Sequence, residues 1–101
     1  MLKLKDGVVW DGVDPEFKET LLTDVITIFD DLKKDMVITS LNDGKHMQGS
    51  YHYKGLAADF RIWNLSPYRP IDVRDMIQEL LGKDYDVVLE KDHIHLEYDP
   101  V

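Results

Sequence analysis

The stretch YDVVLEKDHIHLEY, residues 85–98, decides the fold of this chain. It is rich in residues that favour strands, and we predict strands over about 85–90 and 93–98. Side chains two positions apart on a strand point to the same face of a sheet. His93 and His95 therefore share one face, and the apolar Ile94 and Leu96 share the opposite face.

A second informative stretch, SYHYKGLAADFRI, covers residues 50–62. Its second half predicts a strand over about 56–62, preceded by a loop that the glycines at 49 and 55 flank. His52 then comes from the loop and Asp59 from the strand. Two imidazoles and a carboxylate in this layout suit a zinc site with three protein ligands and one open position, which can bind and activate water. A helical His-Glu-x-x-His motif is absent, so a site built on strands and a loop is the better description.

The pattern Ser50-x-His52-x-x-Gly55-x-Ala57-x-Asp59, followed by His93-x-His95, resembles the zinc D-alanyl-D-alanine carboxypeptidase family. That family includes phage L-alanyl-D-glutamate endopeptidases and shares its metal-site fold with the hedgehog signalling domain. The similarity covers roughly residues 15–99. The first motif is specific because five positions match within ten residues. The His-x-His motif is weak alone and becomes informative because it follows the first motif and lies near the C-terminus.

The resemblance implies a Zn²⁺ ion held by His52, Asp59 and His95. It also implies that His93 steadies the transition state and is not a ligand. The family's general base is a carboxylate three residues before the last ligand, which here is Asp92, and Glu90 is the competing candidate. Strand periodicity places both carboxylates on the face opposite the histidines. A bulge or twist near residue 91 would have to bring one of them to the metal.

The activity that the resemblance implies is hydrolysis of amide bonds in peptidoglycan stem peptides. The sequence leaves the localisation unknown, and a phage-encoded protein that is released or virion-associated would fit. The candidate substrate contacts are Ser50, which lies in the first motif, and Lys45 and Gln48, which lie in a polar loop over 42–49. That loop forms either a plain turn or a wall of the cleft. Arg61 shares the face of Asp59 and either binds a substrate carboxylate or forms a structural ion pair. The alternative function is a non-catalytic, metal-containing binding or virion structural module.

Composition bounds these hypotheses. The 101 residues suffice for one domain, 1–101, and the absence of cysteine excludes disulfides and thiolate zinc sites. A formal net charge of −8 disfavours nucleic acid and anionic membranes as partners, and we expect a monomer. The N-terminus lacks the apolar stretch of a signal peptide, and no run of about 18 apolar residues predicts a membrane span.

Two amphipathic helices complete the prediction. The first begins at Asp14-Pro15-Glu16, where Asp14 is a good N-cap, and continues to residues 33–34; its apolar residues recur every three or four positions. The second covers residues 70–81 and ends near Gly82. With a further strand over about 36–41, the sequence predicts an α+β fold: a small antiparallel sheet, two helices packed on one face, and a metal cleft on the other.

Overall fold

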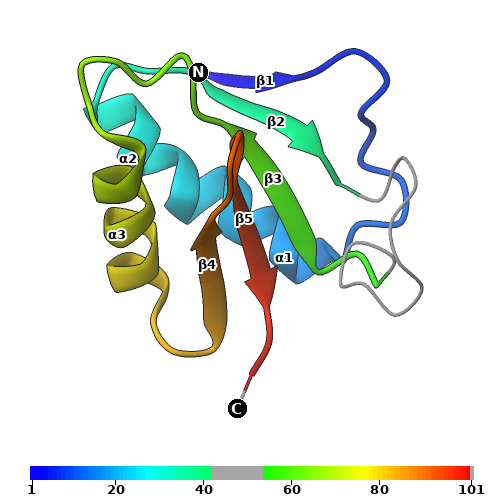
Figure 1. The fold of residues 1–101 in the computed structure, drawn as a ribbon. Coiled ribbons are helices and arrows are strands. Elements are labelled where there is room, and N and C mark those ends of the chain that lie inside the picture. Colours follow the sequence, from blue (N-terminus) through cyan, green and yellow to red (C-terminus); the bar gives the residue numbers. More distant parts are fainter. Residues whose placement is uncertain (42–53, 101) are drawn as a thin grey trace.

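A computed structural model describes residues 1–41 and 54–100 (Figure 1). The helices and strands follow one another as β1 (Leu2–Leu4), α1 (Pro15–Thr20), η1 (Leu21–Val25), α2 (Ile26–Asp31), β2 (Met36–Ser40), β3 (Ala57–Arg61), α3 (Pro70–Leu81), β4 (Tyr85–Leu89) and β5 (His93–Tyr98). The predicted α+β class is confirmed. No helix in the described ranges is long and apolar enough to cross a membrane.

The five strands form one sheet in the order β1-β2-β3-β5-β4. Three of the four neighbouring pairs are antiparallel, and β1 pairs with β2 in parallel. The sheet is therefore mixed, whereas the sequence predicted an antiparallel one. The parallel pair follows from the connection, because the whole helical run from residue 15 to residue 31 lies between β1 and β2 and provides the crossover that parallel strands need.

The first helical run has three parts, α1, η1 and α2, of which η1 is a π-helical turn. Asp14 caps its start, since the carboxylate accepts a hydrogen bond of 3.0 Å from the Phe17 N–H. Phe17, Leu21, Val25 and Phe29, spaced four residues apart, are all buried. Positions four apart drift by about 40° around a regular helix. A wider π turn offsets part of that drift and keeps the four side chains facing the core.

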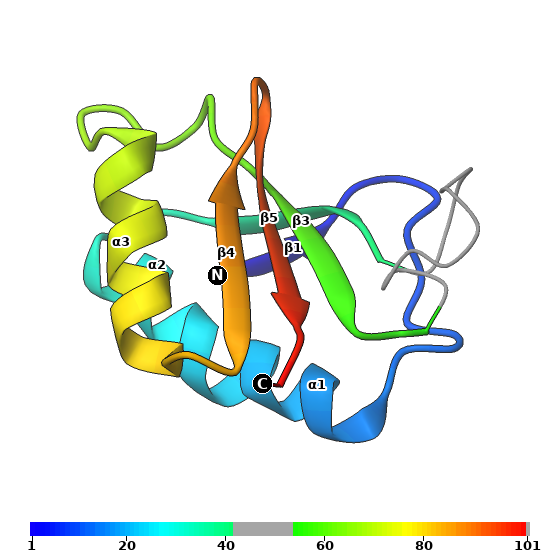
Figure 2. The ribbon, with the colours of Figure 1, turned by 60° about the horizontal axis from the view of Figure 1, so that its bottom comes forward.

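The core lies between the helices and one face of the sheet, as Figures 1 and 2 show. Ala58 and Phe60 of β3, together with Ile94 and Leu96 of β5, are fully buried there. The ring of Phe60 lies 5.8 Å from that of Phe29 on α2. Within the described ranges, helices cover only this face of the sheet. We call the opposite face, which carries the odd-numbered residues of β3 and β5, the open face. The predicted placement of both helices on one face is confirmed.

Helix α3 protects the edge of the sheet that β4 forms. The amide nitrogen of Gln78 donates hydrogen bonds to the carbonyls of Gly82, at 2.9 Å, and Tyr85, at 2.7 Å. Its amide oxygen accepts a bond of 3.2 Å from the Val87 N–H. The Arg74 Nε–H donates to the Val87 carbonyl at 2.7 Å. These side chains satisfy outward backbone groups that an exposed edge would offer to another strand.

We expect Gln78→Ala to lower the free energy of unfolding by about 1–3 kcal/mol, because it leaves part-buried backbone groups of β4 without partners. Urea denaturation followed by circular dichroism measures the change. Glu79→Ala, at the next and exposed position of α3, is the control and should change stability by less than about 0.5 kcal/mol. Equal stability of the two variants would contradict this role for Gln78.

Candidate active site

Pairing between β3 and β5 brings the predicted site residues of the two strands together. Asp59 lies opposite His95, and Arg61 lies opposite His93. All four side chains belong to the open face of the sheet. The Asp59 Oδ1 atom is 2.8 Å from the Nδ1 atom of His95 and 3.7 Å from the Nε2 atom of His93. Two segments more than thirty residues apart in the chain therefore present one carboxylate and two imidazoles at one place.

His95 lies between two carboxylates. Its Nδ1 atom faces Asp59, and its Nε2 atom is 2.7 Å from Oε1 of Glu97, which follows it on the same face of β5. A carboxylate accepts hydrogen bonds, so both ring nitrogens of His95 donate when the ring is protonated. The hydrogen bond to Asp59 and then that to Glu97 raise the pKa of His95 above its usual value. A metal ion on Nδ1 would replace one proton and leave the bond to Glu97 in place.

The turn between β4 and β5 places the Asp92 carboxylate on the histidine side. The Glu90 N–H donates to the His93 carbonyl at 2.8 Å, so residues 91 and 92 form a tight two-residue turn. Strand periodicity ends in this turn, and it brings Oδ1 of Asp92 to 2.6 Å from Nδ1 of His93. That hydrogen bond lowers the pKa of Asp92. The carboxylate is therefore ionised at neutral pH, the form that can accept a proton.

A hollow of about 340 Å³ opens beside these residues on the same face. The residues that line it come from the segment directly after β1, from β2 and β3, from the loop after β3, from the β4–β5 turn and from the start of β5: Lys5, Thr39, Ser40, Asp59, Arg61, Trp63, Asp92 and His93. Glu90 is exposed and is not among them. The structure thus brings Asp92 to the hollow with His93 and Asp59, and it leaves Glu90 outside.

The remaining predicted site residues lie outside the described ranges. These are the metal ligand His52 and the three predicted substrate contacts Lys45, Gln48 and Ser50. The part of the first motif that is described begins after them, at Gly55. There the Gly55 carbonyl accepts a hydrogen bond of 2.9 Å from the Asp14 N–H. A Cβ atom on this glycine would lie 2.2 Å from the Gly12 carbonyl oxygen, and its φ is +73°, so the position suits only glycine.

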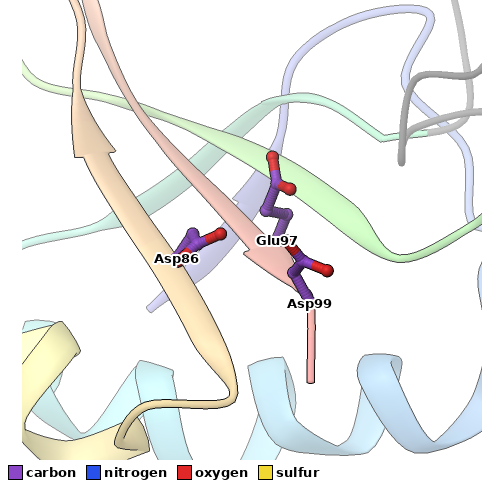
Figure 3. A group of neighbouring side chains, drawn as sticks. All are labelled: Asp86, Glu97 and Asp99. Atoms are coloured by element: carbon purple, nitrogen blue, oxygen red, sulfur yellow. The ribbon is translucent and has the colours of Figure 1, made fainter. Parts of the chain in front are cut away.

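A group of acidic residues that the sequence analysis did not identify lies on the same face (Figure 3). It consists of Asp86 on β4, Glu97 on β5 and Asp99 just after β5. One oxygen from each lies within 4.8 Å of the others, close enough to hold a metal ion. The sequence contains a signal for two of them, since Glu97 and Asp99 are two positions apart. Asp86 joins them because it pairs with Glu97 across the strands.

Comparisons of the chain with models of known protein families, with curated proteins and with solved structures found no match. The geometry of the open face therefore carries the functional argument, together with the motifs described above.

We expect Asp86→Asn to stabilise the protein at neutral pH by less than about 1 kcal/mol, the range for exposed charges. Desolvation by neighbouring protein atoms and then the carboxylates of Asp99 and Glu97 raise the pKa of Asp86, although the residue is exposed. Ionised Asp86 therefore costs stability as the pH rises through its folded-state pKa, and the asparagine removes that cost.

The melting temperature of Asp86→Asn and wild type, measured between pH 3 and pH 8, tests this expectation. The advantage of the variant should disappear below about pH 4, where the aspartate is protonated in both states. Glu79→Gln removes an exposed carboxylate from α3 and is the control for net charge. A less stable Asp86→Asn at neutral pH would show that the charge is needed.

Proposed function

We propose that this chain is a zinc-dependent peptidase that hydrolyses amide bonds in peptidoglycan stem peptides. The observation that carries the proposal is the arrangement around His95. Asp59 meets one ring nitrogen and Glu97 meets the other, on an open sheet face beside a hollow. The family that the motifs resemble supplies the reaction class.

The donor atoms of the described residues fit zinc. Zinc in catalytic sites takes histidine nitrogen and carboxylate oxygen, usually from three protein ligands. Asp59 and His95 offer one oxygen and one nitrogen that already point at each other, and both side chains are mostly buried. Glu97 at Nε2 supports the assignment, because histidine ligands commonly donate their second N–H to a carboxylate. His52 is the proposed third ligand. Bound zinc would lower the pKa of a water molecule to about 7 and polarise the scissile carbonyl.

The residues at the hollow have distinct roles in this reaction. Asp92 is exposed to solvent and ionised, so it can take a proton from water and return it to the leaving amine. It also accepts the hydrogen bond from Nδ1 of His93, which holds that ring with Nε2 toward Asp59. In the protonated ring, Nε2–H can donate to the oxygen on which negative charge develops. Glu90 lacks this position and is the weaker candidate for the base.

We expect about one zinc per purified chain, measured by elemental analysis. His95→Ala and Asp59→Ala should each lose most of it, because each removes one of three ligands. His93→Ala is the matched histidine control and should keep its zinc while losing roughly 10²–10³ in kcat, the scale of one oxyanion donor. Zinc retained by His95→Ala, or lost from His93→Ala, would reverse the assignment of the two histidines.

Zymography on purified peptidoglycan, with and without a chelator, tests the activity itself. A zone of clearing that the chelator abolishes supports the peptidase. Stoichiometric zinc without any hydrolysis would favour the alternative, a non-catalytic metal-containing binding or virion structural module, which uses the same ligands.

We expect Asp92→Asn to keep zinc and to lose roughly 10²-fold or more in kcat, because the amide cannot accept the proton. The asparagine oxygen can still accept the hydrogen bond from His93, so this variant separates proton transfer from ring orientation. Glu90→Gln is the matched control and should be much milder. The opposite ranking would make Glu90 the base, and full activity in both variants would refute the proposed proton transfer.

A further inference from the structure

The hollow is lined by groups of both charges. Asp59, Asp92 and His93 are the lining residues to which the proposed reaction assigns roles. Lys5 and Arg61 supply the cations; they also line a second, neighbouring hollow together, and Arg61 lies over Trp63, so we call these three residues the cationic end. Arg61 belongs to β3, two positions after Asp59, and lies opposite His93 on β5. Arg61, the centre of the cationic end, is therefore held by the same pair of strands that positions the proposed metal ligands Asp59 and His95.

Among the described residues, the guanidinium of Arg61 has an aromatic contact and no carboxylate partner. Its central carbon lies 4.5 Å from the centre of the Trp63 ring, over the ring's face, and the indole is 74% exposed. A guanidinium over an aromatic ring can use its flat face for this contact and keep the N–H groups at its edge for a ligand. No carboxylate in residues 1–41 and 54–100 forms an ion pair with Arg61. Of the two interpretations that the sequence left open, a structural ion pair and a ligand contact, the described structure supports the ligand contact.

The charges around the hollow favour one class of ligand, a singly charged carboxylate. The chain carries a formal net charge of −8, and two carboxylates line the same hollow. In the metal-free protein, an anion is therefore attracted toward Arg61 and Lys5 and repelled by Asp59 and Asp92. A carboxylate suits the planar fork of arginine, which can bind both of its oxygens at once. With a single negative charge, it is also repelled less by Asp59 and Asp92 than a dianion such as phosphate.

Resting on the proposed peptidase function, we propose that Arg61, stacked on Trp63 and assisted by Lys5, binds the carboxylate of the substrate residue on the C-terminal side of the hydrolysed bond. Side chains two positions apart on a strand are about 7 Å apart. One extended residue spans about 3.5 Å, and a charge-assisted hydrogen bond adds about 2.8 Å. A carboxylate held at Arg61 therefore places the preceding amide bond near Asp59 and His93. Arg61 is then a specificity-determining residue.

Binding to the metal-free protein tests the subsite without any catalysis. The probes are an N-acetylated D-alanyl-D-alanine with a free carboxylate and the same dipeptide as its C-terminal amide. We expect the free acid to bind more tightly than the amide in calorimetry and to change the emission of Trp63 in a Trp10→Phe background. Salt should weaken the binding of the acid. Equal affinity for acid and amide, or phosphate competing as strongly as the free acid, would overturn the proposal.

Three variants locate the binding. Arg61→Gln should weaken the acid roughly ten-fold or more and leave the amide unchanged, because it removes a bidentate, charged hydrogen-bonding partner. Arg61→Lys keeps the charge but lacks the planar guanidinium, so its affinity for the acid should lie between those of wild type and Arg61→Gln. It replaces the glutamine variant in the test if that variant does not fold. Lys83→Gln removes an exposed positive charge that does not line the hollow and is the control.

The failures of the two proposals are distinguishable. Preference for the acid that depends on Arg61, without hydrolysis of any peptide, would keep the subsite and refute the peptidase. Zinc-dependent hydrolysis with the same KM for acid and amide in wild type and Arg61→Gln would keep the peptidase and refute the subsite.

Discussion

Antiparallel pairing of β3 with β5, in the register that sets Asp59 opposite His95, is the constraint on which the open face depends. Side-chain direction alternates along a strand, so a shift of one residue would exchange the two faces of β5. Ile94 and Leu96 would then leave the core, where both are fully buried. Burial of one such side chain contributes about 1.5–3 kcal/mol, so apolar packing against the helices holds the register. The polar cluster is thus positioned by contacts on the face that it does not touch.

The open face concentrates negative charge, which the packing of the apolar core does not require. Asp86, Glu97 and Asp99 lie together, and their mutual repulsion contributes to the raised pKa of Asp86. Glu97 is compensated on its other side by His95, which also faces Asp59. A protonated imidazole between two carboxylates offsets part of the repulsion, and a divalent cation at the same place would offset more. Local conflicts of this kind are expected where a protein carries a function.

The sequence predicted the features that one segment determines by itself. Alternation in residues 93–98 placed both histidines on one face, and the N-cap at Asp14 and the helix over 70–81 followed from local rules. Features that depend on two distant segments could not be predicted from the sequence. The parallel pairing of β1, the approach of Asp86 to Glu97 and the π turn all depend on how separate elements fit together. The position of Asp92 depends on a local feature, the short turn that brings its carboxylate to His93. The sequence analysis nevertheless placed Asp92 on the opposite face, because it extended the alternation of the strand one residue into that turn.

The charges around the hollow would also give a direction to the proposed peptide substrate. In the metal-free protein, Arg61 and Lys5 attract an anion, whereas Asp59 and Asp92 repel one, so a peptide with one free carboxylate would favour one orientation. Asp59 and Arg61 are two positions apart on β3, so this strand alone sets the distance between the carboxylate and the guanidinium. Pairing with β5 then adds His95 opposite Asp59 and His93 opposite Arg61. In the proposed reaction, one strand and its pairing would therefore set both the place of cleavage and the direction of the peptide.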